Sequence, residues 1–136
     1  MEKDFKKWHG KKELIDEIKQ RPFFHEREIW FCHIGLNIGF EQDGSGEEFL
    51  RPVVIVRKFT DKIFWGIPLT RSKEHHKINK KSEKYYYSLV FIPGVKSVAI
   101  LSQIRLIDAR RLARLMGMME EKDFKMLKQK LKDLIP

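Results

Sequence analysis

The pattern of hydrophobic and polar positions predicts a helix at each end of the chain. Over residues 4–20, apolar side chains recur at approximately helical spacing among lysines and acids. Pro22 should end this helix, because the residue before a proline is disfavoured in the helical conformation. From Phe124 to Leu134, apolar side chains are spaced by three, four and three residues, which predicts an amphipathic helix over residues 121–135.

Between the two helices, the periodicity changes to that of β-strands. Short runs rich in valine, isoleucine and aromatic residues alternate with polar or glycine-containing segments. Strands are predicted at residues 28–34, 52–56, 62–69, 84–92 and 97–101, and a short helical turn at residues 109–115. Five or six short strands with polar connections, closed by helices, predict a mainly β fold with a small antiparallel barrel.

Two of the connections are candidates for a functional role. Residues 35–50 form a segment of about sixteen residues that contains several glycines and has no apolar periodicity. Residues 71–83 are polar and rich in lysine. Connections longer than about 12–15 residues in a compact domain usually have a function.

The charge of the chain indicates a polyanionic partner. Its 136 residues, enough for one domain, include 28 lysines and arginines against 19 acidic residues, a net charge of +9. Residues 57–84 hold nine basic and three acidic residues, so six of these charges fall in one stretch. Basic domains of this kind bind nucleic acid, acidic membrane surfaces or acidic proteins, and a contribution to solubility alone is the alternative.

Several other classes of protein are excluded by what the sequence lacks. No apolar run approaches the ~20 residues of a membrane span, and the N-terminus lacks the apolar stretch of a signal peptide, so we expect a cytoplasmic protein without membrane association. One cysteine, Cys32, excludes an internal disulfide and a multi-cysteine zinc site. Glycine motifs that bind phosphate or dinucleotides are absent, and His75 and His76 have no partner at metal-ligand spacing, so neither a cofactor nor a metal ion is predicted.

Polar side chains at the ends of predicted strands are candidates for binding phosphate. Arg51 precedes one strand, Thr70 follows another, and Ser102, Gln103 and Arg105 follow a third. The planar guanidinium of arginine donates parallel hydrogen bonds to a phosphate and stays charged at any working pH. This arrangement does not distinguish catalysis from binding.

Two further polar residues, Cys32 and His33, lie within the first predicted strand among bulky apolar side chains. We expect a buried, unreactive thiol at Cys32. For His33 we expect a histidine packed in the core, and a catalytic role is the alternative.

Four motifs follow one another along the chain. They are Glu28-Ile29-Trp30, Gly39-Phe40-Glu41-Gln42 with Arg51-Pro52-Val53, Ile67-Pro68-Leu69-Thr70, and the segment from Ser97 to Asp108 that contains Gln103-Ile104-Arg105. In this order they resemble the motifs of MazF/PemK-like toxins, the endoribonucleases of type II toxin–antitoxin systems. The first motif departs in one position, because Arg27 stands where the family usually has glycine.

The resemblance implies an SH3-like β-barrel with C-terminal helices over residues 26–136, preceded by an N-terminal helical extension at residues 1–25. It also implies a homodimer with an RNA groove along the subunit interface. The implied activity is sequence-selective, metal-independent cleavage of single-stranded messenger RNA through attack by the 2′-hydroxyl, silenced by a cognate antitoxin protein. No cofactor is implied.

The resemblance also assigns roles to the residues that match its motifs. Arg51 would stabilise the charge that develops on the phosphate, Thr70 would orient the phosphate, and Ser102 would complete the catalytic set. Residues expected to bind RNA are Glu41, Gln42, Arg71, Lys73, Lys77, Lys80, Lys81, Gln103 and Arg105.

Three positions depart from the family pattern around the chemistry. Ser102 and Ile100 stand where some relatives have an acidic residue and an arginine that act as base and acid, and Phe40 stands where some have a histidine. A serine is a poor general base unless another group activates it. Candidates for a displaced base are Glu41, Asp43 and His33. The alternative function is a non-catalytic barrel that binds RNA or a protein target such as a topoisomerase.

Overall fold

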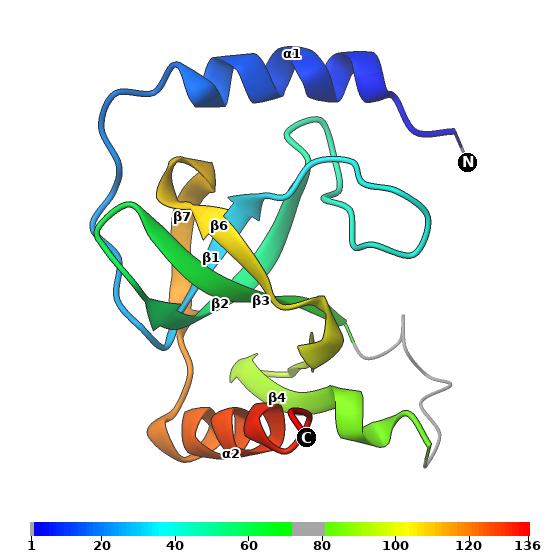
Figure 1. The fold of residues 1–136 in the computed structure, drawn as a ribbon, viewed down its shortest axis with the longest axis vertical. Coiled ribbons are helices and arrows are strands. Elements are labelled where there is room, and N and C mark those ends of the chain that lie inside the picture. The colour runs from blue at the N-terminus through cyan, green and yellow to red at the C-terminus, as the bar shows by residue number, and fades with distance from the viewer. Residues whose placement is uncertain (1, 72–80) are drawn as a thin grey trace.

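The computed structural model describes residues 2–71 and 81–136. Within these ranges, helix α1 (Phe5–Asp16) precedes a curled antiparallel sheet, and helix α2 (Glu121–Lys132) follows it (Figure 1). The strands are β1 (Glu28–His33), β2 (Leu50–Lys58), β3 (Ile63–Arg71), β4 (Tyr86–Ile92), β5 (Val95–Ile100), β6 (Arg105–Asp108) and β7 (Leu112–Met118), and the 3-10 turns are η2 (Glu83–Tyr85), η3 (Leu101–Gln103) and η4 (Ala109–Arg111).

The sheet has the strand order β4-β5-β3-β2-β1-β7, and β6 pairs with β3 beside this path. Strand β3 pairs with β2 and also with two further strands, because residues 63–66 pair with β6 and residues 69–71 pair with β5. All of these pairs are antiparallel. The predicted mainly β fold with helices at both ends is confirmed, and the barrel takes the form of a curled half-barrel.

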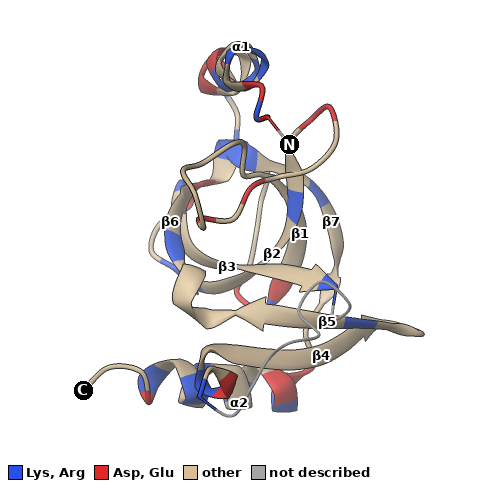
Figure 2. Cartoon of the chain, turned by 90° about the vertical axis from the view of Figure 1, so that its right-hand side faces the viewer, with Lys and Arg blue, Asp and Glu red and all other residues tan. Residues whose placement is uncertain are grey.

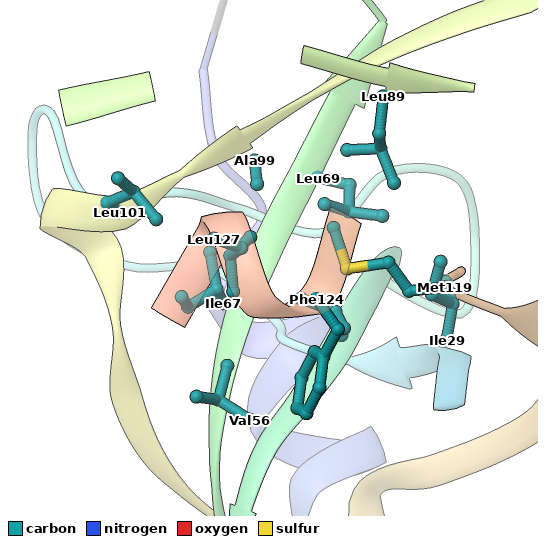
Figure 3. Close-up of a cluster of buried hydrophobic side chains, with 11 residues drawn as sticks. Ile29, Val56, Ile67, Leu69, Leu89, Ala99, Leu101, Met119, Phe124 and Leu127 are labelled. Carbon is teal, nitrogen blue, oxygen red and sulfur yellow. The ribbon is translucent and has the colours of Figure 1, made fainter. Parts of the chain in front are cut away.

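The middle of β2 is buried on both faces, which explains why this strand reads as a continuous apolar run. Because side chains alternate along a strand, Val53 and Ile55 enter one core and Val54 and Val56 enter another. The inner core contains Phe24, Trp30, Cys32, Ile34, Val53, Ile55, Phe64, Ile107, Ala109 and Leu112. The outer core, shown in Figure 3, contains Ile29, Val54, Val56, Ile67, Leu69, Leu89, Ala99, Leu101, Met119, Phe124 and Leu127.

The prediction of a helical turn at residues 109–115 was wrong in its second half. Only η4 is helical, and β7 follows it directly and pairs with β1. Leu112, Leu115 and Met116 have a spacing that suits a helix. Pairing with the edge of β1 decides the conformation, because the backbone groups of that edge need partners that a helix could not provide.

The first helix is shorter than predicted. It ends at Asp16 rather than at residue 20, because the chain then runs along the barrel to bring Phe24 into the inner core, where its side chain is fully buried. Helix α2 is also shorter than predicted. It ends at Lys132 rather than at residue 135, and the residues after it form turns. Among the described residues, no helix is both long enough and apolar enough to span a bilayer.

A cluster of charged side chains attaches the end of the N-terminal segment to the barrel. Arg21 donates from Nε and Nη2 to the two carboxylate oxygens of Asp108, at 3.0 and 2.9 Å. Arg110 donates to the same two oxygens, at 3.2 and 3.0 Å. Burial alone would raise the pKa of the Asp108 carboxyl, but the hydrogen bonds from Arg21 and Arg110 outweigh it and hold the pKa well below its usual range.

This lowered pKa predicts an acid-dependent contribution of Asp108 to stability. The folded carboxyl has the lower pKa, so its contribution is complete above the unfolded pKa of about 3.9 and is lost as the pH falls toward the folded value. Asp108→Asn should therefore lower the melting temperature at pH 7, and the difference from the wild type should narrow below about pH 4. Thermal melts from pH 7 to pH 3 measure this, with Asp61→Asn, an exposed carboxylate, as the control. A difference that does not change with pH would contradict the assignment.

Candidate functional site

A pocket of about 270 Å³ lies between the loop that joins β1 to β2 (residues 34–49, the β1–β2 loop) and the elements β3, η3 and β6. Its lining consists of Ile34, Asn37, Glu41, Gln42, Pro68, Ser102, Gln103, Ile104, Arg105 and Ile107. Five of these were predicted as site residues from the sequence, namely Glu41, Gln42, Ser102, Gln103 and Arg105. We call this cavity the site pocket.

Gln103 joins two motifs that are far apart in the sequence. Its Oε1 accepts a hydrogen bond from the backbone N–H of Gln42 at 3.4 Å, and its Nε2 donates to the carbonyl oxygen of Phe40 at 3.3 Å. Asn37 supports the same segment from the other side, because its Nδ2 donates to the carbonyl oxygen of Gln42 at 2.7 Å. Glu41 is thus held by contacts to both of its neighbours.

Arg51 and Thr70 lie beside the site pocket on adjacent strands. The Arg51 guanidinium donates from Nε to the carbonyl oxygen of Asp43 at 2.6 Å and from Nη1 to that of Leu69 at 3.3 Å. Val53 of β2 pairs with Pro68 of β3, and Arg51 and Thr70 each lie two residues from this pair. Thr70 is buried, with 5% of its surface exposed. Loop and sheet together therefore fix the direction of the Arg51 side chain.

Arg105 gives the site pocket a positive charge. It begins β6, opposite Gly66 of β3, and its side chain is partly exposed. In the part of the chain that the structure describes, its guanidinium has no hydrogen-bond or ion-pair partner. Burial lowers the pKa of the nearby Arg111, and the charge of Arg105 lowers it further. Arg105 can accordingly pair with an anionic group such as a phosphate, while Glu41 supplies the opposite charge in the same lining.

The structure separates the three candidates for a general base. His33 is buried, and its Nδ1 lies 2.7 Å from the carbonyl oxygen of Glu48, which confirms a packed histidine. The Asp43 carboxylate is 3.0 Å from the ammonium of Lys3. Among the described residues, Glu41 supplies the one carboxylate in the lining of the site pocket, and its Oε1 accepts from the backbone N–H of Ile38 at 2.9 Å.

Ser102 occupies the same lining as Glu41. It is an exposed residue of the 3-10 turn η3. It stands between Leu101, which is buried, and Gln103, which is partly buried. Cys32, by contrast, has no part in the pocket. Burial raises the pKa of its thiol to about 12, so the thiol stays protonated at physiological pH, and the predicted buried thiol is confirmed.

Of the other predicted basic residues, Arg71 and Lys81 lie outside the lining of the site pocket. Arg71 ends β3 and is exposed, and Lys81 is exposed before η2. Lys73, Lys77 and Lys80, like His75 and His76, lie outside the described residues. Figure 2 shows both acidic and basic residues on α2, in agreement with a solvated helix surface rather than a single-sign stripe.

Two residues near the site were not identified from the sequence. Asn37 shapes the loop, and Lys3 pairs with Asp43. Phe40, which the sequence motif had already singled out, is fully exposed on the loop. The contact of Lys3 has no local signal, because its partner is forty residues away.

The chain is similar to known proteins in sequence and in fold. The family described as "PemK-like, MazF-like toxin of type II toxin-antitoxin system" matches residues 26–135. A search of curated proteins found no match. The crystal structure of MazF (Form-I) from Deinococcus radiodurans is similar in fold, with a TM-score of 0.58 and 17% sequence identity, over 86% of this chain and 98% of that chain.

Proposed function

Because the chain belongs to the PemK-like, MazF-like toxins of type II toxin–antitoxin systems, we propose that it is a sequence-selective endoribonuclease that cleaves messenger RNA without a metal ion and is silenced by a cognate antitoxin protein. The observation that carries the proposal is the site pocket. There Glu41, Ser102, Gln103 and Arg105 converge beside an Arg51 whose guanidinium is oriented by two backbone carbonyls.

The proposed reaction begins at the 2′-hydroxyl of the RNA. Glu41 takes the proton of this hydroxyl, and the oxygen attacks the adjacent phosphorus. The bond between phosphorus and the 5′-oxygen then breaks, and the 5′-oxygen takes up a proton from water. The products are a 2′,3′-cyclic phosphate and a free 5′-hydroxyl. Because the attacking group belongs to the ribose, DNA is not a substrate.

Two arginines stabilise the phosphate during this reaction. Negative charge increases on its non-bridging oxygens as the 2′-oxygen attacks, and guanidinium groups that are already oriented stabilise that charge without reorganisation. Arg51 is held by the carbonyl oxygens of Asp43 and Leu69, and Arg105 lines the site pocket. Thr70 orients the phosphate, and Gln42 and Gln103 contact the bases or the backbone. Lys73, Lys77, Lys80, Lys81 and Arg71 attract the strand.

The test uses purified protein and a long single-stranded RNA transcript, with and without a chelator, followed by mapping of the new ends. We expect cleavage in both conditions, at a restricted set of sequences, with cyclic phosphate on one side and 5′-hydroxyl on the other. DNA of the same sequence should remain intact. Absence of cleavage, or cleavage that disappears with the chelator, contradicts the proposal.

A second candidate function is favoured by the serine at position 102. Some relatives have an acidic residue there, and a barrel that has lost its base would bind RNA without cutting it. Retention of the intact transcript on a filter, with no cleavage, supports this RNA-binding function. Neither binding nor cleavage would favour a protein target, such as a topoisomerase.

We propose that the active form is a homodimer. A single pocket of about 270 Å³ is short beside an RNA strand, and a second copy would extend the groove. Large apolar side chains are exposed for such a contact at Ile38, Phe40, Trp65 and Leu106. Light scattering at micromolar concentration should give about twice the chain mass of 16.3 kDa. A species of the chain mass alone would contradict the dimer.

A further inference from the structure

The N-terminal segment contacts the β1–β2 loop, although it lies outside the residues that match the toxin family. Three of its side chains reach this loop, namely those of Lys3, Trp8 and Lys11. Figure 1 shows α1 at the same end of the barrel as the loop, which is drawn in cyan and green. The loop carries Glu41 and Gln42, so these contacts bear on the site pocket.

Lys3 contacts the loop at Asp43, whose carbonyl oxygen also accepts a hydrogen bond from Arg51. Its ammonium is 3.0 Å from Oδ2 of Asp43 and donates to the carbonyl oxygen of Asn37 at 2.6 Å. The other carboxylate oxygen of Asp43 accepts from the backbone N–H of Asn37 at 2.6 Å. The carbonyl oxygen of Asp43 accepts from Nε of Arg51, also at 2.6 Å. Asp43 therefore links Lys3 through its side chain to Arg51 through its backbone.

Trp8 packs where the two ends of the loop meet. Gly35 has a φ of +80°, and a Cβ built on it would lie 2.0 Å from the Trp8 ring, so the indole rests directly on the glycine backbone. The Trp8 and Phe49 rings are 5.3 Å apart, and the N–H of Gly35 donates to the carbonyl oxygen of Phe49 at 3.2 Å. Trp8 and Phe49 are both buried, with Ile15 completing the cluster.

From these contacts we propose that residues 3–16 form a positioning element of the active site, which holds the β1–β2 loop in the conformation that orients Arg51 and presents Glu41. A loop of this length loses considerable conformational entropy when it is ordered, and the packing of Trp8 together with the Lys3–Asp43 pair offsets that loss. Lys3 acts through Asp43 and has no contact with substrate. The kinetic consequences of this inference rest on the proposed endoribonuclease function.

The kinetic test compares Lys3→Met with Lys7→Met, which removes the same charge from an exposed position of the same segment. We expect Lys3→Met to lower kcat for cleavage of a single-stranded RNA transcript by about fivefold, the order of magnitude for one partly buried ion pair, and to change KM by less than about twofold. Lys3→Arg, which keeps the charge, should retain the wild-type kcat, and Lys7→Met should also leave kcat unchanged. In an Asp43→Asn background the effect of Lys3→Met should disappear, because the two residues act in one pathway. Equal kinetics for Lys3→Met and the wild type would overturn the proposal.

Hydrogen exchange of the free proteins separates this inference from the proposed function. Peptides covering residues 35–49 should exchange faster in Lys3→Met than in the wild type or Lys7→Met, with the melting temperature of the barrel little changed. If the wild type does not cleave RNA and this difference is seen, the proposed function fails and the positioning of the loop stands. If the wild type cleaves RNA and exchange in these peptides is unchanged, the positioning element is refuted and the function stands.

Discussion

Arg51→Ala should reduce RNA cleavage by roughly 10²–10³-fold, because removal of one pre-oriented donor to the developing charge typically costs that much in rate. The barrel should stay folded, since the Arg51 side chain ends on the carbonyl oxygens of Asp43 and Leu69 and belongs to neither apolar core. Arg51→Lys should recover only part of the rate, because a compact ammonium does not reproduce the two divergent contacts of the guanidinium. Cleavage rates and melting curves of both variants measure this.

Arg57→Ala is the matched control for Arg51→Ala. Arg57 lies on the same strand, is exposed, and is opposite Trp65. It should affect cleavage by much less than Arg51→Ala. Full activity in a stable Arg51→Ala protein would exclude Arg51 from the chemistry. Activity that falls only in proportion to the folded fraction would mean that Arg51 holds the loop and does not act on the phosphate.

The fold was largely predictable because short apolar runs in the sequence mark most of its strands. Four consecutive apolar residues in β2 indicated a strand buried on both faces, and this is what the two cores show. Strand β7 could not be predicted in the same way. Its conformation is decided by pairing with β1, about eighty to ninety residues earlier in the sequence, and the local spacing in residues 112–118 does not indicate that partner.

The site was predictable in its parts and less so in its assembly. The sequence marked Glu41, Gln42 and Gln103 separately, but the hydrogen bond between Gln42 and Gln103 spans 61 residues. The proposal of Glu41 among three candidate bases also needed the structure, because the packing of His33 and the pairing of Asp43 with Lys3 are not visible in the sequence. Contacts of this kind depend on the closed barrel and leave no periodicity in the sequence.

Arg27 shows how the structure can explain a departure from the family pattern. It stands where the resemblance to the family motif would place glycine, and its φ of +81° lies in the left-handed region that favours glycine. The backbone there is fixed by its N–H, which donates to the carbonyl oxygen of Ile55 at 2.7 Å, and by its carbonyl oxygen, which accepts from the N–H of Met119 at 2.9 Å. The side chain pairs with Glu121 at 3.0 Å. The conformation is therefore imposed by the junction of the strands, whichever residue occupies the position.

Glu41→Gln should lower the cleavage rate by roughly 10²–10⁴-fold, which is the usual contribution of a positioned general base. Glutamine keeps an oxygen that can accept the hydrogen bond from the N–H of Ile38, so the turn that presents residue 41 should persist. Glu47→Gln is the matched control, because Glu47 is exposed on the same loop and does not line the site pocket. It should have little effect. A Glu41→Gln protein that cleaves RNA at the wild-type rate would exclude Glu41 as the base.

Ser102→Asp then shows whether the position of the carboxylate within the pocket is flexible. Ser102 and Glu41 line the same cavity, so an aspartate at 102 should recover part of the activity lost in Glu41→Gln. In the wild-type background the same substitution should change the rate little, because a base is already present. If Ser102→Asp alone raised cleavage by 10²-fold or more, the natural site would lack a working base, since a newly supplied base produces a gain of that size. The comparison of the single and double variants therefore distinguishes an active toxin that uses Glu41 from a barrel that has lost its catalytic carboxylate.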